Sequence, residues 1–255
     1  MNTPMKAIIR KDLKSILSDK RMFSAILIVP LFLTVVLPAI FMAAIYFGAD
    51  DPDMRQMLTL LPQYDPAGDI RPVASAMILN NIMPIFFIMI PVMTSSIMAA
   101  SSFVGEKEKH TLETLLYCPL SVKQIFRAKI AASFLLSMLV SCISFAAMIT
   151  VLETISYILA GSLLSLGLNW LVTMFIISPA ISVIAITFIV RCSAKARSVE
   201  ESQQKAAFIV IPIIVLVAEQ LAGFMLLSPP VMLIIGILCV IAAGLLLRFT
   251  PVSLP

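Results

Sequence analysis

Few side chains in this sequence have the type and spacing that catalysis needs. The single histidine, His110, cannot build a Ser/His/Asp arrangement or the H-E-x-x-H motif of a metalloprotease. The four cysteines lack the spacing of a zinc site, and the G-x-x-x-x-G-K-[ST] loop that cradles phosphates is absent. We therefore expect no catalytic residues, no metal site and no cofactor in this chain, and no enzymatic activity.

The sequence offers instead a compact charged segment, residues 105–129, between two long apolar runs. No charged residue lies between Arg71 and Glu106, and none lies between Lys129 and Glu153. Charge gathered on one short segment of an apolar chain indicates a contact made in water. The chemistry it offers is recognition, because acidic and basic side chains beside leucines suit docking to a second protein.

The charged segment reads as a helical hairpin. Residues 106–116 predict a short helix, whose apolar stripe comprises Leu112, Leu115 and Leu116. Pro119 ends this helix. Ser121 is then a suitable N-cap for the next helix, with Gln124 completing a capping box.

A simpler alternative is that these charges only anchor two membrane helices at the interface. It accounts well for Lys123, Arg127 and Lys129, which precede the next apolar run. It accounts poorly for three leucines carried out of the membrane beside so many charges.

The elements that position this segment follow from composition. Of the 255 residues 60% are hydrophobic and 13% charged, and the mean hydropathy is +1.06. A soluble domain of this length cannot bury so much apolar surface, so the solvent must be largely lipid. A membrane-spanning helix takes about 20 residues. Six stretches qualify, at residues 22–48, 73–104, 130–155, 167–190, 206–227 and 231–247. The predicted fold is an all-α integral membrane protein, with residues 22–255 as one domain.

The orientation of the spans follows from the basic residues. Sixteen of the 18 lysines and arginines fall on one side of the predicted topology, and only Arg55 and Arg71 fall on the other. The positive-inside rule then places both termini in the cytoplasm. The net charge of +4 reflects this topology, so nothing else supports a nucleic-acid partner.

The segment before the first span, residues 1–21, predicts an amphipathic helix on the membrane surface. Its apolar residues recur at helical spacing, namely Met5, Ile8, Ile9, Leu13, Ile16 and Leu17. Its charged residues fall mostly opposite, namely Lys6, Arg10, Lys11, Asp12 and Lys14. An ordinary positively charged flank is the alternative. In the first two spans, Pro30, Pro38, Pro84 and Pro91 predict kinked helices.

Polar residues inside the spans are candidates for function, because a charge costs about 2.5–3.5 kcal/mol at the centre of a membrane helix. Glu153 reads as a boundary residue at the outer end of span three. Glu219, beside Gln220, lies deeper in span five and reads either as a pathway residue or as a hydrogen bond between spans. Asn80 and Asn81 lie in span two, where packing is the simpler account.

One segment carries a family resemblance. Residues 103–116, F-V-G-E-K-E-K-H-T-L-E-T-L-L, are followed by P-L-S at 119–121 and by Lys129. This closely resembles the signature of type-2 ABC exporter permeases, in which a glutamate-x-glutamate pair precedes T-L-E-T-L-L between spans two and three. His110 stands where the family more often has arginine or lysine. The six spans and the N-terminal interfacial helix resemble the family as well.

The resemblance implies that the charged segment is a coupling helix received by a separate ABC ATPase subunit, which supplies ATP and Mg. The implied docking residues are Glu106, Lys107, Glu108, Thr111, Leu112, Glu113, Leu115, Leu116, Pro119 and Ser121. A second loop, residues 191–205, adds a smaller contact in this interpretation, although a solvated loop is simpler. The implied cargo path lies along spans two and five and includes Asn80, Asn81, Glu219 and Gln220.

The resemblance also implies a function and an assembly. We expect the permease subunit of an ATP-driven exporter in a prokaryotic cytoplasmic membrane, paired as a homodimer or with a second permease and surrounded by membrane lipids. The cargo, whether drug, peptide, lipid or ion, is open. One alternative is a non-transporting membrane anchor that passes mechanical signals from an ATPase. The other is a lipid-modifying membrane enzyme, which would need clustered acidic or histidine residues that the sequence lacks.

Overall fold

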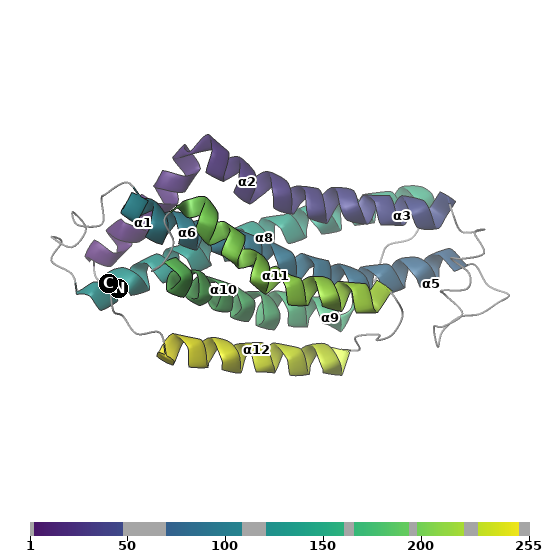
Figure 1. The fold of residues 1–255 in the computed structure, drawn as a ribbon. Coiled ribbons are helices and arrows are strands. Elements are labelled where there is room, and N and C mark those ends of the chain that lie inside the picture. The colour runs from purple at the N-terminus through teal and green to yellow at the C-terminus, as the bar shows by residue number, and fades with distance from the viewer. Residues whose placement is uncertain are drawn as a thin grey trace.

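Six long helices run side by side along one axis in the computed structural model (Figure 1). It describes residues 3–47, 70–108, 121–160, 166–193, 198–221 and 229–249, and these parts of the chain contain no strand. The predicted all-α fold is therefore confirmed. The helices are α1 (Thr3–Ser18), α2 (Lys20–Leu31), α3 (Leu37–Phe47), α5 (Ile70–Met77), α6 (Met83–Glu108), α8 (Val122–Ala160), α9 (Leu168–Val172), α10 (Ser178–Ser193), α11 (Val199–Leu221) and α12 (Pro229–Phe249).

Six helical stretches are long and apolar enough to cross a membrane, as the sequence predicts. They are Met22–Phe47, Ala74–Glu108, Lys123–Ile158, Leu168–Cys192, Val199–Ala218 and Pro229–Arg248. Two of them extend beyond the predicted bounds into the charged segment. The second span stays helical through Glu108, so the helix predicted to start at Glu106 does not begin separately. The third begins already at Val122, so residues 122–129 are its first turns.

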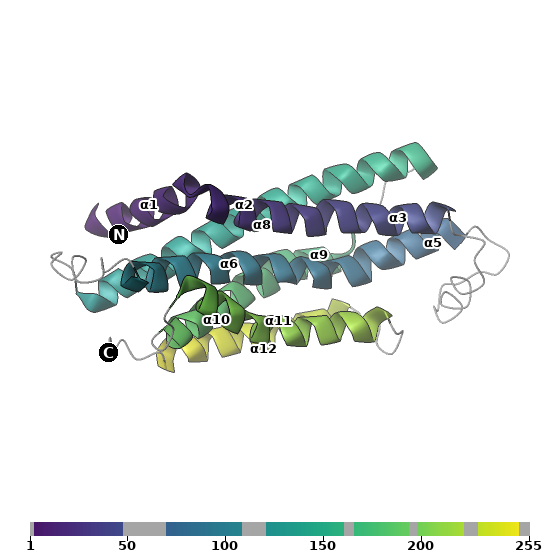
Figure 2. The same cartoon turned by 45° about the horizontal axis from the view of Figure 1, so that its top comes forward.

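The N-terminal helix α1 packs along α8 and meets α2 at a bend (Figure 2). Asp19 forms this bend, and its Oδ1 accepts a hydrogen bond from the Met22 amide at 3.4 Å, in the manner of an N-cap. On α1, Ile8, Ile9 and Ile16 are buried against the bundle. The helix is therefore a packed part of the fold, and its predicted place on the membrane surface stays a prediction.

Three of the spans contain a short π-helical segment that comes just before a proline. These segments are η1 (Phe32–Val36), η2 (Ile78–Ile82) and η3 (Thr173–Ile177). In each, a proline follows two residues after the last π-helical residue: Pro38, Pro84 and Pro179. Proline has no N–H and crowds the carbonyl four residues before it, and a wider turn relieves that contact. Pro30 and Pro91, in contrast, lie inside regular α-helix.

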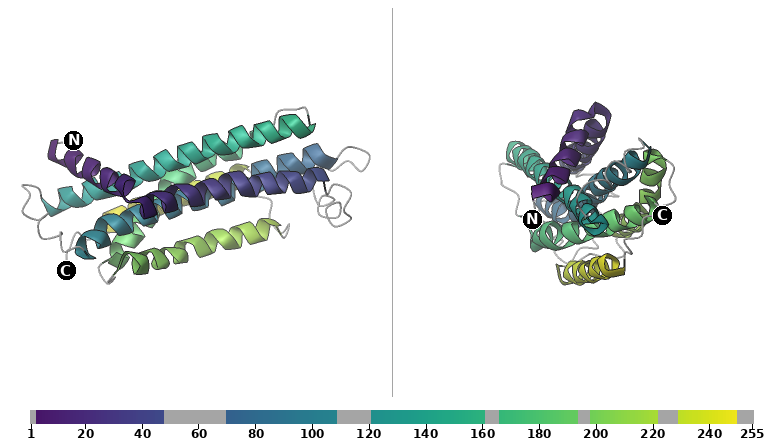
Figure 3. Two further views of the ribbon diagram at one scale, coloured as in Figure 1. Left: turned by 90° about the horizontal axis from the view of Figure 1, so that it is seen from above. Right: turned by 90° about the vertical axis from the view of Figure 1, so that its left-hand side faces the viewer.

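The helix α6 is the centre of the bundle and contacts α8, α10 and α11 (Figure 3). In the most apolar window of its span 78% of the residues are buried, against 17% for the last span. Apolar side chains of α12 such as Leu238 and Ile241 are half exposed. A movement at either end of α6 must therefore displace most of its neighbours, whereas α12 borders the bundle.

Candidate functional site

The predicted docking residues begin at the end of α6. Glu106 is buried there, whereas Lys107 and Glu108 are exposed. Ser121 begins α8 with the predicted capping box, since its amide donates to Gln124 Oε1 at 3.0 Å and its Oγ accepts from the Gln124 amide at 3.3 Å. The remaining predicted docking residues lie outside the described residues: Thr111, Leu112, Glu113, Leu115, Leu116 and Pro119.

Glu106 joins α6 to two other helices. Its Oε1 lies 2.6 Å from Lys11 Nζ on α1, and its Oε2 lies 2.7 Å from Lys129 Nζ on α8. The Lys129 side chain is 2% exposed and the Glu106 side chain 10%, whereas the Lys11 side chain is 54% exposed. The Glu106–Lys129 pair is therefore shielded from water, and the Lys11 pair is at the surface.

Asp12 and Ser102 complete this group, which we call the basal cluster: Lys11, Asp12, Ser102, Glu106 and Lys129. Ser102 Oγ donates to Asp12 Oδ2 at 2.7 Å. Lys129 Nζ donates to the Ser102 carbonyl and to Ser102 Oγ, and lies 3.8 Å from Asp12 Oδ2. Two cations thus face two carboxylates, so the cluster has no net charge. A protein loses much stability when one member of a buried ion group of this kind is removed.

Lys129 corrects the sequence interpretation most clearly, because a flank residue at the interface would be exposed. Its position on the helix could have predicted its burial from the sequence. Ile125, Ala128, Ala132 and Leu136 are all buried, and Lys129 falls on the same helical stripe. A charge on such a stripe must meet a partner inside the fold.

Glu108 contacts a different element from Glu106. Its Oε2 accepts a hydrogen bond from the Val199 amide, the first residue of α11, at 3.4 Å. Ser198 caps the same helix, because its Oγ accepts from the Glu201 amide at 3.2 Å. Lys205 forms an i,i+4 pair with Glu201 at 2.8 Å. Residues 199–205 of the predicted second loop are thus the first turns of α11, and they adjoin the end of α6. The glutamate-x-glutamate pair links α6 to α1, α8 and α11.

Asn80 and Asn81, predicted for the cargo path, take part in contacts between spans at the opposite end of α6. Asn80 Oδ1 accepts from the Gly167 amide at 2.6 Å, and the Asn80 carbonyl accepts from Asn169 Nδ2 at 2.8 Å. Asn169 Nδ2 also lies 3.3 Å from Asn81 Oδ1. Trp170 Nε1 donates to the Leu79 carbonyl at 3.0 Å.

These contacts answer a need created by Pro84. In an α-helical register the carbonyl of residue 80 pairs with the N–H of residue 84, and in a π register the carbonyl of residue 79 does so. Proline has no N–H to give, and η2 covers both carbonyls. The side chains of Asn169 and Trp170 supply the two donors.

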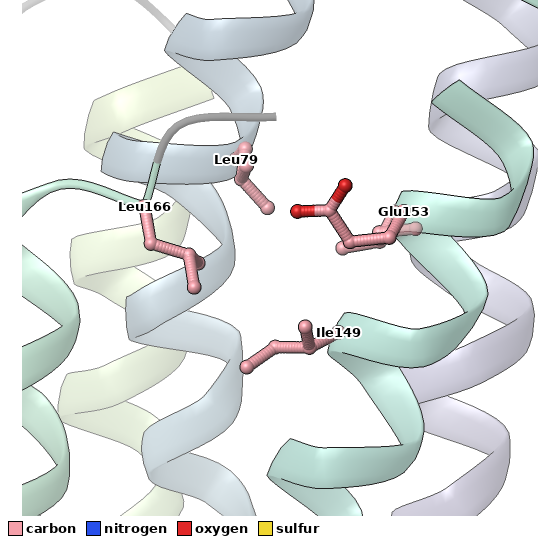
Figure 4. A pocket seen from close by; sticks show the side chains of 5 residues that line it. Leu79, Ile149, Glu153 and Leu166 are labelled. Atoms are coloured by element: carbon pink, nitrogen blue, oxygen red, sulfur yellow. The ribbon is translucent and has the colours of Figure 1, made fainter. Parts of the chain in front are cut away.

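The acidic residues predicted inside the membrane are placed in different ways. Glu219 and Gln220 lie near the end of α11, and their side chains are outside the described residues. Glu153 is half-buried and turns its carboxylate toward Leu79 of η2, above Ile149 and opposite Leu166 (Figure 4). The space between them measures about 10 Å³, about enough for one water molecule.

Buried hydroxyls connect three spans at mid-height, which the sequence interpretation did not identify. Thr94 Oγ1 donates to Ser137 Oγ at 3.1 Å, and Ser137 Oγ lies 3.1 Å from Ser182 Oγ and 3.0 Å from the Pro91 carbonyl. All three hydroxyl side chains are fully buried. On α8 the serines recur as Ser133, Ser137, Ser141 and Ser144 on one face, and that periodicity was the available signal.

The described part of the chain contains no group of three histidine, cysteine, aspartate or glutamate residues placed to hold a metal ion. Its geometry is that of a polytopic membrane protein whose central span ends in two glutamates, Glu106 and Glu108, that contact three other helices. The family of ABC-2 transporter proteins matches residues 6–234, and the chain belongs to this family. Neither a curated protein nor a solved structure matches the chain significantly. The chain is thus a membrane permease of the ABC transporter class.

Proposed function

We propose that this chain is the permease subunit of an ATP-driven exporter, and that the segment after Glu108 receives the force of a separate ABC ATPase. Family membership supports the permease role. The observation that carries the coupling role is the glutamate-x-glutamate pair, which joins the base of α6 to α1, α8 and α11.

The basal cluster gives a physical route for such coupling. Residues 109–120, which include six of the ten predicted docking residues, connect α6 to α8 in the sequence. Lys129 holds these two helices together through Glu106 and Ser102. A force on the segment therefore moves α6 and α8 as one unit. Because α6 is the central helix, that unit carries the core of the bundle with it.

The assembly follows the same proposal. ATP and Mg belong to the ATPase subunit, two permeases form the transport path as a homodimer or heterodimer, and both termini lie in the cytoplasm. Asn80, Asn81, Glu219 and Gln220 remain the proposed cargo-path residues. Asn80 and Asn81 hydrogen-bond to the start of span four, so an opening of the path at this point has to break these bonds.

The test separates docking from transport. The double variant Leu112→Asp with Leu116→Asp places two charges on the predicted apolar stripe and should abolish co-purification with the ATPase and ATP-dependent transport. Lys14→Asp, at an exposed position on α1 outside the charged segment, is the control and should change neither. If the double variant kept both ATPase binding and export, the coupling proposal would be wrong.

Inside-out and right-side-out vesicles with reconstituted complex test the direction of transport. ATP-dependent accumulation in inside-out vesicles supports export. An intact complex that hydrolyses ATP but moves no substrate in either orientation would instead support the non-transporting anchor.

A further inference from the structure

A partly enclosed cavity of about 210 Å³ lies between α1 and the basal end of α6, beside the basal cluster. It shares Lys11, Asp12, Ser102 and Glu106 with that cluster. Its lining comprises Lys11, Asp12, Ser15, Ile16, Met98, Ser101, Ser102, Gly105 and Glu106. An apolar cavity of about 150 Å³ holds a benzene ring, so this space suits a group of somewhat more atoms.

One wall of the cavity carries a buried carboxylate with an unused oxygen. Asp12 is 6% exposed, and its Oδ2 accepts from Ser102. Its other oxygen, Oδ1, has no hydrogen-bond partner among the described residues. This oxygen is open to the cavity and not fully enclosed by protein, so it can accept a hydrogen bond from a donor that enters there. Lys129 is already engaged with Glu106 and Ser102.

The cavity also offers hydrogen-bond donors and a positive charge. The hydroxyls of Ser15 and Ser101 make no side-chain hydrogen bond within the described part of the chain. Lys11, whose side chain is 54% exposed, brings its ammonium to the same lining. These groups suit a phosphate oxygen. Donors for an anion and an acceptor for a cation therefore lie within one small space.

We propose that this cavity binds the headgroup of an aminophospholipid, with the primary ammonium on Asp12 and the phosphate beside Lys11, Ser15 and Ser101. A simple anion is a poor fit, because Asp12 and Glu106 would repel it. A simple cation offers no acceptor to the hydroxyls of Ser15 and Ser101. A zwitterion whose two charges lie a few bonds apart can bind the Asp12 carboxylate with its cation and the surrounding donors with its anion.

The position of the cavity identifies the lipid as the source of this headgroup. Ile16 and Met98, both buried in the fold, form the apolar part of the lining. Ile16 belongs to the apolar face of the amphipathic helix α1. Helices of this kind lie with their apolar face at the boundary between headgroups and acyl chains. Met98 belongs to the membrane-spanning α6. A bound lipid would thus bridge α1 and α6 next to the Lys11–Glu106 pair.

The test uses the purified full chain in detergent, titrated with palmitoyl-oleoyl phosphatidylethanolamine, phosphatidylcholine or phosphatidylglycerol, with bound lipid counted by native mass spectrometry. We expect one phosphatidylethanolamine retained per chain, about tenfold more tightly than the other two, the scale of one charge-assisted hydrogen bond. The quaternary ammonium of choline has no N–H for Asp12, and glycerol has no cation.

Two variants locate the lipid. Asp12→Asn removes the negative acceptor, and Ser101→Leu fills the cavity while leaving every member of the basal cluster in place; each should lower retention about tenfold. Ser18→Leu is the matched control, because Ser18 is exposed on the same helix and outside the cavity. It should bind like the wild type.

Three results would overturn the proposal. Equal retention of all three lipids would remove the headgroup assignment, and full retention by Ser101→Leu would remove the cavity. Soluble phosphoethanolamine that competes as well as the lipid does would assign the site to a free metabolite. A wild-type chain that retains no lipid would contradict the proposal outright.

Discussion

Replacing Lys129 with methionine is the most direct test of the basal cluster. Methionine has a similar length and no charge, so the substitution leaves the volume nearly filled and removes only the ammonium. Lys129 lies 2.7 Å from Glu106 Oε2 and 3.8 Å from Asp12 Oδ2, and it also donates to Ser102. Its removal leaves two carboxylates, whose side chains are 10% and 6% exposed, without their buried cation, while the surface cation Lys11 stays paired with Glu106.

The expected cost follows from this geometry. Breaking a buried ion pair by removing one partner costs about 3–5 kcal/mol. Lys11 still compensates one carboxylate, so the lower end, about 3 kcal/mol, applies here. For a chain of this size, a loss of about 3 kcal/mol lowers the Tm by roughly 6–12 °C.

Thermal unfolding of the purified chain in detergent measures this shift. Lys123→Met, exposed on the same helix, is the control and should stay within about 1–2 °C of the wild type. A second variant combines Lys129→Met with Glu106→Gln and Asp12→Asn. This triple variant should recover part of the lost stability, because the two amides carry no charge and no buried carboxylate is left without a cation. A Lys129→Met protein as stable as the wild type would refute the argument that this ion group holds α6, α8 and α1 together.

Two further predictions concern the other polar contacts between spans. Asn169→Ala removes the donor to the Asn80 carbonyl and should cost about 1–3 kcal/mol in thermal stability. In a Pro84→Ala background, where residue 84 regains an N–H, the same change should cost less, and an equal cost in both backgrounds would contradict the role given to Pro84. Ser137→Ala should cost about 0.6–1.7 kcal/mol, since its hydroxyl contacts Thr94, Ser182 and the Pro91 carbonyl. Thr150→Ala is its control, because Thr150 is exposed and its hydroxyl donates to the Ala146 carbonyl of its own helix. A Ser137→Ala loss no larger than that of Thr150→Ala would show that the hydroxyl contacts add nothing.

Hydropathy and local patterns predict the architecture of this chain well. Six apolar stretches of sufficient length leave little choice of fold, and the Ser121–Gln124 capping box depends only on residues three apart. The extent of the helices was harder to predict. Charge alone marks Glu106 and residues 122–129 as lying outside the membrane helices, yet both continue them, because a helix does not end where its composition changes.

The pairing of polar residues was not predictable from one sequence. Glu106 finds its partners 95 positions earlier in the chain and 23 positions later, and no local rule selects them. Packing was the simpler account of Asn80 and Asn81, but their partners in span four lie more than 80 positions away and could not be named. The local sequence did predict which face of a helix a residue lies on, and this spacing marks Lys129 and the α8 serines as inward-facing.

The three π-helical segments have a consequence for comparing this chain with its relatives. A π turn accommodates about one more residue than an α turn over the same length of axis, so each segment acts as a one-residue insertion. Beyond Val36, Ile82 and Ile177, the helical face that meets the core is therefore shifted in numbering by about one position. A homologue without the corresponding proline should align best with a single-residue gap at that point. An ungapped alignment would match buried positions of one chain to lipid-facing positions of the other.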